Sequence, residues 1–428
     1  MFMAVFEVWT SGILYFCVYL QRMRNYVFSA NCFMDIDFFY KILNIDSTSG
    51  KECGLADLLS AEFAAPGRKV ELYEVGDGTK NLLVSWGSPK LIFCTHLDTV
   101  PPYIPPTSGP LCHSEQSEVS PASDAMFYGR GTCDAKGQLF AMWEACKALE
   151  AEGCTDFGLL LLAGEETGSF GAKAFDKLVS ENPAVIQSSS VILSEAKDLS
   201  IQDVWLVVGE PTDNCMASAA KGTKSFEVTF EGKAFHSGYP EYGVSAVMLF
   251  NDFVNALRSI RFPSDELLGE TTFNIGKLIS DNPQNILSDR LTCRIYFRTT
   301  FESDEMVCNV MKNMAGPDAR LRFGRPRVQD GSDIVAKDVA PWQKAMTVNA
   351  FGGDAPTRFE TLPGFETRPV SFGSDAPQLK CFRHKILCGP GSILVAHRPE
   401  ERIALADLEQ AVANYVRIYE TINGESVS

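Results

Sequence analysis

Three runs of apolar residues in this chain each end abruptly in polar side chains. They are residues 91–98 (LIFCTHLD), 157–166 (FGLLLLAGEE) and 204–212 (VWLVVGEPT). An apolar run without polar alternation is typical of a strand buried on both faces, as in a parallel sheet covered by helices. Because the carboxyl ends of parallel strands meet at one edge of a sheet, we expect these polar residues to gather there. The sequence therefore predicts a functional site along that edge.

Helical patterns separate these apolar runs along the chain. Apolar residues recur at helical spacing in 37–45, 51–65, 138–153 and 403–422. This alternation of strands and helices predicts the α/β class, with a mixed, largely parallel sheet flanked by helices. We expect residues 34–216 and 324–428 to form this domain together.

A different pattern starts near Lys224. Residues 225–235 (SFEVTFEGKAF) alternate between apolar and polar with period two, which is typical of a half-exposed antiparallel strand. Strand and helix patterns continue to residue 323, with 319–323 (ARLRF) expected as the last strand. Residues 217–323 are therefore predicted to form an inserted α+β lid domain, and residues 339–352 after it are predicted to be helical.

Composition excludes several classes of protein. Of the 428 residues, 45% are hydrophobic and 21% are charged, which is typical of a globular chain and not of a disordered one. The net charge of −16 disfavours a nucleic-acid partner, because an acidic surface repels phosphates. The 13 cysteines form no C-x-x-C pair and lie mostly in apolar stretches, so we expect reduced core cysteines and a cytoplasmic location.

Residues 1–33 do not fit the strand–helix alternation. The apolar run Val8–Leu20 has 13 residues, whereas a membrane-spanning helix needs about 20. Glu7 precedes the run, where a secretory signal has positive charge. We expect an extension outside the fold and no membrane partner, with a membrane anchor as the alternative. The Ser/Glu-rich segments 112–123 and 188–200 are expected to be surface loops without a chemical role.

Five groups of candidate metal ligands follow strands or open helices. One group pairs His96 with Asp98, two residues apart, so that both side chains point the same way in an extended chain. An aspartate behind a histidine orients the imidazole that binds a metal. The other groups are Asp134 in a glycine-punctuated loop, the adjacent Glu165 and Glu166, Glu210, and His397.

Each group has an ordinary explanation when it is taken alone. Asp134 could cap a helix, and the pair Glu165 and Glu166 could be a solvated strand end. Two adjacent carboxylates after a buried strand repel each other, however, and a cation would offset that repulsion. Nitrogen and oxygen ligands without thiolate suit zinc, cobalt or manganese. Together, the histidines and carboxylates could hold two metal ions about 3.5–4 Å apart.

The motifs occur in an order that resembles a known family. They are HLDTVP (96–101), GRGTCDAKG (129–137), AGEETGS (163–169), GEPT (209–212) and AHRPEE (396–401). The set is similar to the motifs of the dinuclear zinc amidohydrolases and peptidases, which include acetylornithine deacetylase, succinyl-diaminopimelate desuccinylase, aminoacylase and glutamate carboxypeptidase. The resemblance covers residues 34–428 and implies a catalytic α/β domain with an inserted lid through which homodimers form.

The resemblance also implies a ligand set for two divalent ions, with zinc as the first expectation and cobalt or manganese as alternatives. His96 and Glu210 would bind one ion, Glu166 and His397 would bind the other, and Asp134 would bridge the two. Water bound in such a site has a pKa near 7 and is a nucleophile at neutral pH.

Further roles follow from the same resemblance. Glu165 would be the general base and Asp98 would orient the first histidine. His236 in the lid would stabilise the oxyanion, often from the partner subunit. An arginine, Arg298, would pair with the α-carboxylate of the substrate. The candidate substrate-binding residues are Asn285, Arg298, Gly373 and Ser374.

The function that the resemblance implies is hydrolysis of an amide bond by a metal-activated water, with a glutamate as general base. The first interpretation is a deacylase of N-acyl amino acids, of the acetylornithine deacetylase or succinyl-diaminopimelate desuccinylase type, which GEPT at 209–212 favours. The alternative is a di- or tripeptidase or a carboxypeptidase that takes short peptides. A catalytically silent binding protein is disfavoured, because every expected ligand and the base are present.

Overall fold

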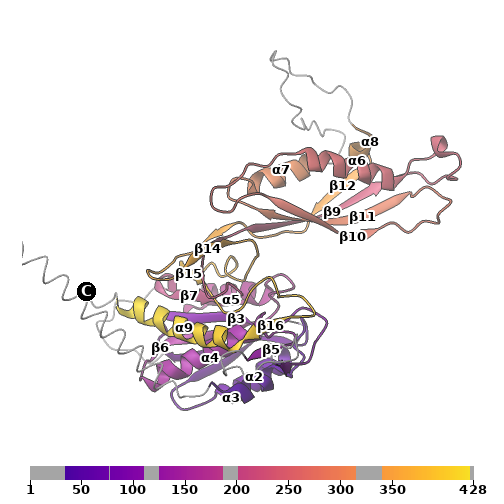
Figure 1. The fold of residues 1–428 in the computed structure, drawn as a ribbon. Helices are drawn as coiled ribbons and strands as arrows, with labels where there is room; N and C mark the ends of the chain where they lie inside the picture. Colours follow the sequence, from indigo (N-terminus) through magenta and orange to yellow (C-terminus); the bar gives the residue numbers. More distant parts are fainter. Residues whose placement is uncertain (1–33, 77, 110–124, 187–200, 315–339, 425–428) are drawn as a thin grey trace, which may run out of the picture.

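The computed structural model describes residues 34–76, 78–109, 125–186, 201–314 and 340–424. The expected extension 1–33, both Ser/Glu-rich segments and the expected strand 319–323 lie outside these residues. Within the described ranges, no helix combines the length and the apolar character that a membrane span needs. Figure 1 shows two lobes, one around a six-stranded sheet and one around a four-stranded sheet.

The larger lobe is built on the six-stranded sheet, in the order β1-β2-β6-β3-β7-β15. Its parallel strands are β6 (Asp156–Leu162), β3 (Leu91–His96), β7 (Trp205–Val208) and β15 (His384–Leu387). Strand β2 (Thr79–Gly87) pairs antiparallel with both β6 and the edge strand β1 (Lys69–Gly76). The predicted mixed, largely parallel sheet is confirmed. The three apolar runs are adjacent strands, so their carboxyl ends lie side by side.

Helices cover both faces of this sheet (Figure 1). One face packs against α2 (Ile36–Leu43), α3 (Cys53–Phe63), α4 (Lys136–Ala151) and α9 (Leu405–Gly424). The other face packs against α5 (Phe170–Glu181). Aromatic rings fill the first interface, where Phe63 stacks on Trp143 with ring centroids 3.8 Å apart. Burial on both faces is the physical reason why these strands lack polar alternation.

The smaller lobe is the inserted α+β domain, and its presence confirms the predicted fold class. Its sheet is antiparallel throughout, in the order β10-β11-β9-β12. The strands are β9 (Gly222–Glu231), β10 (Thr272–Ile279), β11 (Arg290–Thr299) and β12 (Met346–Ala350). Helices α6 (Ala246–Ser259) and α7 (Asp304–Met314) share a buried core with the sheet, so they cover one of its faces.

The end of this domain differs from the sequence-based expectation. The helical prediction for 339–352 is wrong, because only α8 (Pro341–Lys344) is helical and β12 follows it. Strand β12 pairs with β9, and this pairing satisfies the backbone groups that a longer helix would have satisfied internally. The lid sheet therefore extends beyond the expected boundary at residue 323.

The lid sheet also starts later in the sequence than expected. The residues before it belong to a small sheet of the larger lobe. Strand β8 (Met216–Ala220) pairs with β13 (Thr357–Arg358) and β14 (Thr367–Val370), so the lid sheet begins at Gly222 and not at residue 217. A further sheet has the order β16-β5-β4. Its strands are β16 (Arg402–Ala404), β5 (Met126–Tyr128) and β4 (Thr107–Gly109). Short 3₁₀ helices lie at Pro183–Val185, Ile201–Asp203 and Pro240–Tyr242. Because β5 and β16 pair antiparallel, the loop that follows β5 lies beside the loop that precedes β16.

Candidate metal centre

His96 is the last residue of β3 and lies at the carboxyl edge of the sheet. Its side chain is only 2% exposed. Its Nε2 lies 3.1 Å from Asp134 Oδ1, and its Nδ1 lies 2.8 Å from the main-chain oxygen of Asp98. A proton on Nδ1 can therefore be donated to that oxygen, which leaves Nε2 directed at the carboxylate expected to bridge two metals.

Asp98 is completely buried and joins three parts of the site. Its Oδ1 accepts a hydrogen bond from the main-chain N–H of Glu165 at 2.9 Å and lies 3.5 Å from His96 Nδ1. Its Oδ2 accepts from the main-chain N–H of Glu166 at 3.2 Å and from Ser49 Oγ at 2.8 Å. Asp98 thus orients the histidine through its main-chain oxygen and the turn that bears the two glutamates through its carboxylate.

Glu166 and His397 come from loops that are distant in the sequence. Glu166 lies in the turn after β6, and His397 lies in the loop between β15 and β16. His397 Nε2 is 2.9 Å from Glu166 Oε1 and 3.2 Å from Asp134 Oδ2. Asp134 therefore faces His96 with one carboxylate oxygen and His397 with the other.

The five expected ligands form two overlapping groups. One consists of His96, Asp134 and Glu210, and the other consists of Asp134, Glu166 and His397. Within each group, the ligand atoms all lie within 4.8 Å of one another. Since Asp134 belongs to both groups, the arrangement matches the one that the sequence motifs imply for a bridged pair of ions.

Glu165, the expected general base, lies against the same centre. It forms a third group with His96 and Glu166 whose ligand atoms also lie within 4.8 Å of one another. Burial raises the pKa of Glu165 well above its usual value; His96 opposes this shift, and the charge of Asp375 adds to it. A raised pKa suits a carboxylate that has to accept a proton and release it again near neutral pH.

The centre holds more negative charge than its histidines balance. Burial raises the pKa of Glu210 well above its usual value, and neighbouring carboxylates add to the shift. Burial also raises the pKa of Glu166, although a hydrogen bond from His397 opposes this. Burial disfavours the charged form of Asp134 as well, but hydrogen bonds from His397 and His96 hold its pKa below the usual range. Two divalent cations would offset this excess charge, so the residues fit a metal pair.

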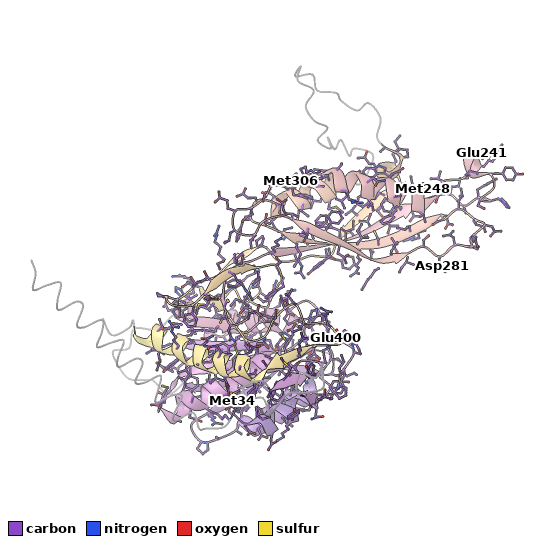
Figure 2. All side chains as sticks on the ribbon, in the orientation of Figure 1. Met34, Glu241, Met248, Asp281, Met306 and Glu400 are labelled. Atoms are coloured by element: carbon purple, nitrogen blue, oxygen red, sulfur yellow. The ribbon has the colours of Figure 1, made fainter. Side chains whose placement is uncertain are left out.

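The lid residues His236 and Asn285 lie together but apart from the ligand groups. The main-chain N–H of Ser237 donates to the main-chain oxygen of Asn285 at 2.8 Å. The His236 ring is exposed, and its Nδ1 accepts from the N–H of Gly238 at 3.0 Å. Figure 2 shows Glu241, in the same segment, at the end of the lid that is remote from the larger lobe. In this conformation of the chain, His236 therefore belongs to the lid surface.

Arg298, in contrast, reaches the larger lobe. Its guanidinium lies 5.0 Å from the ring centroid of Tyr296 and forms no hydrogen bond or ion pair with any described residue. A Cβ atom placed on Gly373 would lie 3.9 Å from Arg298 Nη1. Ser374 is buried beside it, and its Oγ accepts from the N–H of Ala376 at 3.4 Å. The structure thus brings the expected carboxylate-binding arginine to the expected substrate loop.

Two residues that support the site were missed in the sequence. Ser49 donates to Asp98, and Glu401 accepts a hydrogen bond from the main-chain N–H of Asp134 at 3.0 Å. Neither follows an apolar strand, so the pattern that identified the ligands does not identify them. The position of Glu401, four residues after His397 in the last motif, is the signal that could have pointed to it.

A comparison with models of protein families matches residues 92–421 to one described as "Peptidase family M20/M25/M40". The chain belongs to this family. The matched range includes all five expected ligands, the expected base and the lid residues discussed above. The resemblance inferred from the motifs is confirmed, and the chain is a hydrolytic enzyme that acts on amide bonds.

Similar proteins include curated relatives from fungi. One from Aspergillus niger, named a "probable carboxypeptidase", is 29% identical over 413 residues, which cover 90% of this chain and 89% of the relative. Solved structures include a tripeptidase from Staphylococcus aureus, with a TM-score of 0.66 and 19% identity, covering 90% of this chain and 97% of that one. An M20 family metallo-carboxypeptidase from Sulfolobus solfataricus has a TM-score of 0.62 and 15% identity, covering 90% and 98%. The two structures establish the shared fold.

The pH dependence of zinc affinity tests whether His397 binds a metal. Hydrogen bonds to Asp134 and Glu166 raise the pKa of His397 to about 10, so the metal-free imidazole is protonated at neutral pH. An imidazole has to lose that proton to bind a metal. While the pH stays below this pKa, zinc affinity should therefore rise with pH, by about tenfold per unit for each proton displaced. Calorimetric titration in buffers of different ionisation enthalpy measures both quantities, and an affinity independent of pH would contradict the expectation.

Proposed function

We propose that this M20-family enzyme is a metal-dependent carboxypeptidase, which hydrolyses the amide bond before the C-terminal residue of a short peptide. The observation that carries this proposal is the pair of ligand groups that share Asp134, with Glu165 beside them. Arg298, which has no anionic partner among the described residues, supports a substrate with a free carboxylate. The name of the Aspergillus niger relative supports a peptide as that substrate.

Two divalent ions fit the two ligand groups. One would be held by His96, Asp134 and Glu210, and the other by Asp134, Glu166 and His397. When bound, such ions supply an acidified water and polarise the scissile carbonyl. Zinc is the metal we expect, with cobalt and manganese as alternatives, because the ligands are nitrogen and oxygen atoms without thiolate.

The side chains of the protein supply the proton transfers and the positioning. Glu165 accepts the proton of the attacking water on its carboxylate and later delivers it to the leaving amine. Asp98 holds that glutamate in place through the hydrogen bond to its main-chain N–H. Arg298 pairs with the substrate carboxylate and so places the reacting bond beside the base. His236 donates a hydrogen bond to the oxyanion once it has been brought to the site.

A substrate panel tests this function. It compares short peptides with a free C-terminal carboxylate against the same peptides with an amidated C-terminus. A hydrogen bond to a charged group contributes about 1.5–3 kcal/mol, so we expect kcat/KM to be about 10- to 100-fold higher for the free peptides. Arg298→Gln should remove most of this preference. Equal rates on free and amidated peptides would contradict the proposal.

Deacylation of N-acyl amino acids is the second candidate. An N-acyl amino acid presents the same amide bond and the same carboxylate to the site, and the GEPT motif that contains Glu210 favours it. The panel therefore includes N-acetyl and N-succinyl amino acids. Turnover of these compounds without turnover of dipeptides or tripeptides would favour the deacylase over the carboxypeptidase.

We also infer that the lid forms a homodimer. The lid bears apolar side chains that are each more than half exposed: Tyr239, Tyr242, Met248, Leu278 and Ile279. Figure 2 labels Glu241, Met248 and Asp281 on the same outer part of the lid. Exposed apolar patches of this kind are typical of interaction surfaces. A two-fold contact through this patch would let His236 of one subunit serve the centre of the other.

Two variants test the role of the lid. His236→Ala should lower kcat by about 10²- to 10³-fold, the usual cost of losing an oxyanion donor, without changing the metal content. Met248→Asp should separate the subunits, as sedimentation measures, and should lower kcat by a similar factor. Asp252→Asn, an exposed change on the same helix α6, is the matched control. Full kcat in the His236 variant would leave that residue as a polar surface group only.

We place the enzyme in the cytoplasm, where thiols are kept reduced. The support is that all ten cysteines in the described part of the chain are free, and several are core residues. Titration of thiols in the unfolded protein, purified without reductant, tests this: we expect all 13 cysteines of the sequence to react.

A further inference from the structure

Glu401 is buried between the loop that bears Asp134 and the loop that bears His397. Its side chain has no exposed surface. Its Oε1 accepts hydrogen bonds from the main-chain N–H groups of Gly131 at 2.9 Å, Cys133 at 3.1 Å and Asp134 at 3.0 Å. Three N–H groups that converge on one oxygen form the kind of concavity that binds anions. The loop that ends in Asp134 is therefore folded around this carboxylate.

The other oxygen of the same carboxylate is also used. Glu401 Oε2 accepts from Nη1 of Arg130, whose side chain is buried as well. Arg130 Nε donates in turn to the main-chain oxygen of Pro102 at 3.3 Å. A buried ion pair holds its place only if the remaining hydrogen-bonding positions are satisfied, and here both carboxylate oxygens are. The carboxylate thus has one defined position between the two loops.

Main-chain contacts join the same two loops. Where β5 ends and β16 begins, the N–H of Gly129 donates to the main-chain oxygen of Glu401 at 3.0 Å. Cys133 Sγ donates to the main-chain oxygen of Ser392 at 3.4 Å. Glu400, by contrast, is exposed on the larger lobe (Figure 2). Of two adjacent glutamates, one is therefore a surface residue and the other is the link between ligand loops.

We propose that Glu401 is a positioning residue, which sets Asp134 opposite His397 and thereby assembles the ligand group of the second metal. This inference rests on the proposed dinuclear site and concerns how that site is built. There is a structural reason why Glu401 should affect the second metal more than the first. Both groups contain Asp134, but the first also has His96 at the end of β3 and Glu210 two residues after β7. The second takes two of its three ligands, Asp134 and His397, from the loops that Glu401 joins.

Glu401→Gln is the decisive variant. Glutamine keeps the shape, but its NH₂ group has to face either the three main-chain N–H groups or the guanidinium of Arg130, and all of these are donors. Metal-free protein is titrated with zinc by calorimetry, and bound zinc is counted by mass spectrometry. We expect two ions in the unmodified enzyme. In the variant, we expect the first ion to bind within about threefold of its normal affinity and the second about 10- to 100-fold more weakly.

Glu400→Gln makes the same chemical change one residue away and should leave both affinities unchanged. Two ions bound with normal affinity by Glu401→Gln would overturn the proposal. Equal weakening of both ions, in step with a lower melting temperature of the metal-free protein, would also overturn it, because that result marks a general structural role. Fewer than two ions in the unmodified enzyme would overturn the dinuclear site itself, and this role with it.

A second variant covers the case in which Glu401→Gln does not fold. Arg130→Met leaves the three main-chain N–H groups on Glu401 Oε1 but removes the cation from Oε2. It should weaken the same second ion by a smaller factor and leave the first ion unchanged. An unchanged second affinity in this variant would count against the positioning role of Glu401.

Discussion

Glu165→Gln is expected to lose nearly all turnover while both metals stay bound. Glutamine has almost the same size, and its main-chain N–H can still donate to Asp98, so the turn should keep its shape. The amide cannot accept the proton of the attacking water, and loss of a general base typically costs about 10²–10⁴-fold in rate. The measurement is kcat on the best substrate of the panel, together with the zinc content of the same preparation.

Zinc content separates the two roles that Glu165 could have. An oxygen of its carboxylate lies within 4.8 Å of the ligand atoms of His96 and Glu166, so geometry alone would also allow it to bind a metal. Zinc that disappears in step with activity would identify Glu165 as a ligand and not as the base. Glu166→Gln is the matched comparison, because we expect it to lose the ion shared with His397 as well as the activity.

Asp134→Asn is expected to have the largest effect on metal binding, with loss of both ions. The two carboxylate oxygens face different histidines, His96 at 3.1 Å and His397 at 3.2 Å. Asparagine offers one oxygen, and its NH₂ group would face one of the two ligand groups as a donor. Zinc content should fall close to zero, and hydrolysis should fall below detection.

The control for this variant is Asp252→Asn, the same change at an exposed position of α6. It should retain both ions and full activity. If Asp134→Asn kept one ion at full occupancy, Asp134 would be a ligand of a single metal, and the bridged arrangement would have to be abandoned.

The central sheet could be predicted because burial of its strands leaves a local pattern in the sequence. A strand buried on both faces has to be apolar along its length, so β3, β6 and β7 are visible as apolar runs. The lid was visible for a similar reason, since its first strand alternates where one face is exposed. Strand β12 could not be predicted from the sequence pattern, because its five residues form a strand through pairing with β9.

The sequence by itself determined which residues can bind metal at the sheet edge. His96 ends a buried strand, Glu166 and Glu210 lie shortly after one, and a polar side chain at such a point has to lie at the carboxyl edge. Only the tertiary structure decided how Asp134 meets His397 and what holds them there. Glu401 contacts the main chain of Asp134 across 267 residues of sequence. A contact over such a separation, made by loops without periodic pattern, is set by how β5 and β16 pair and not by any local property of the chain.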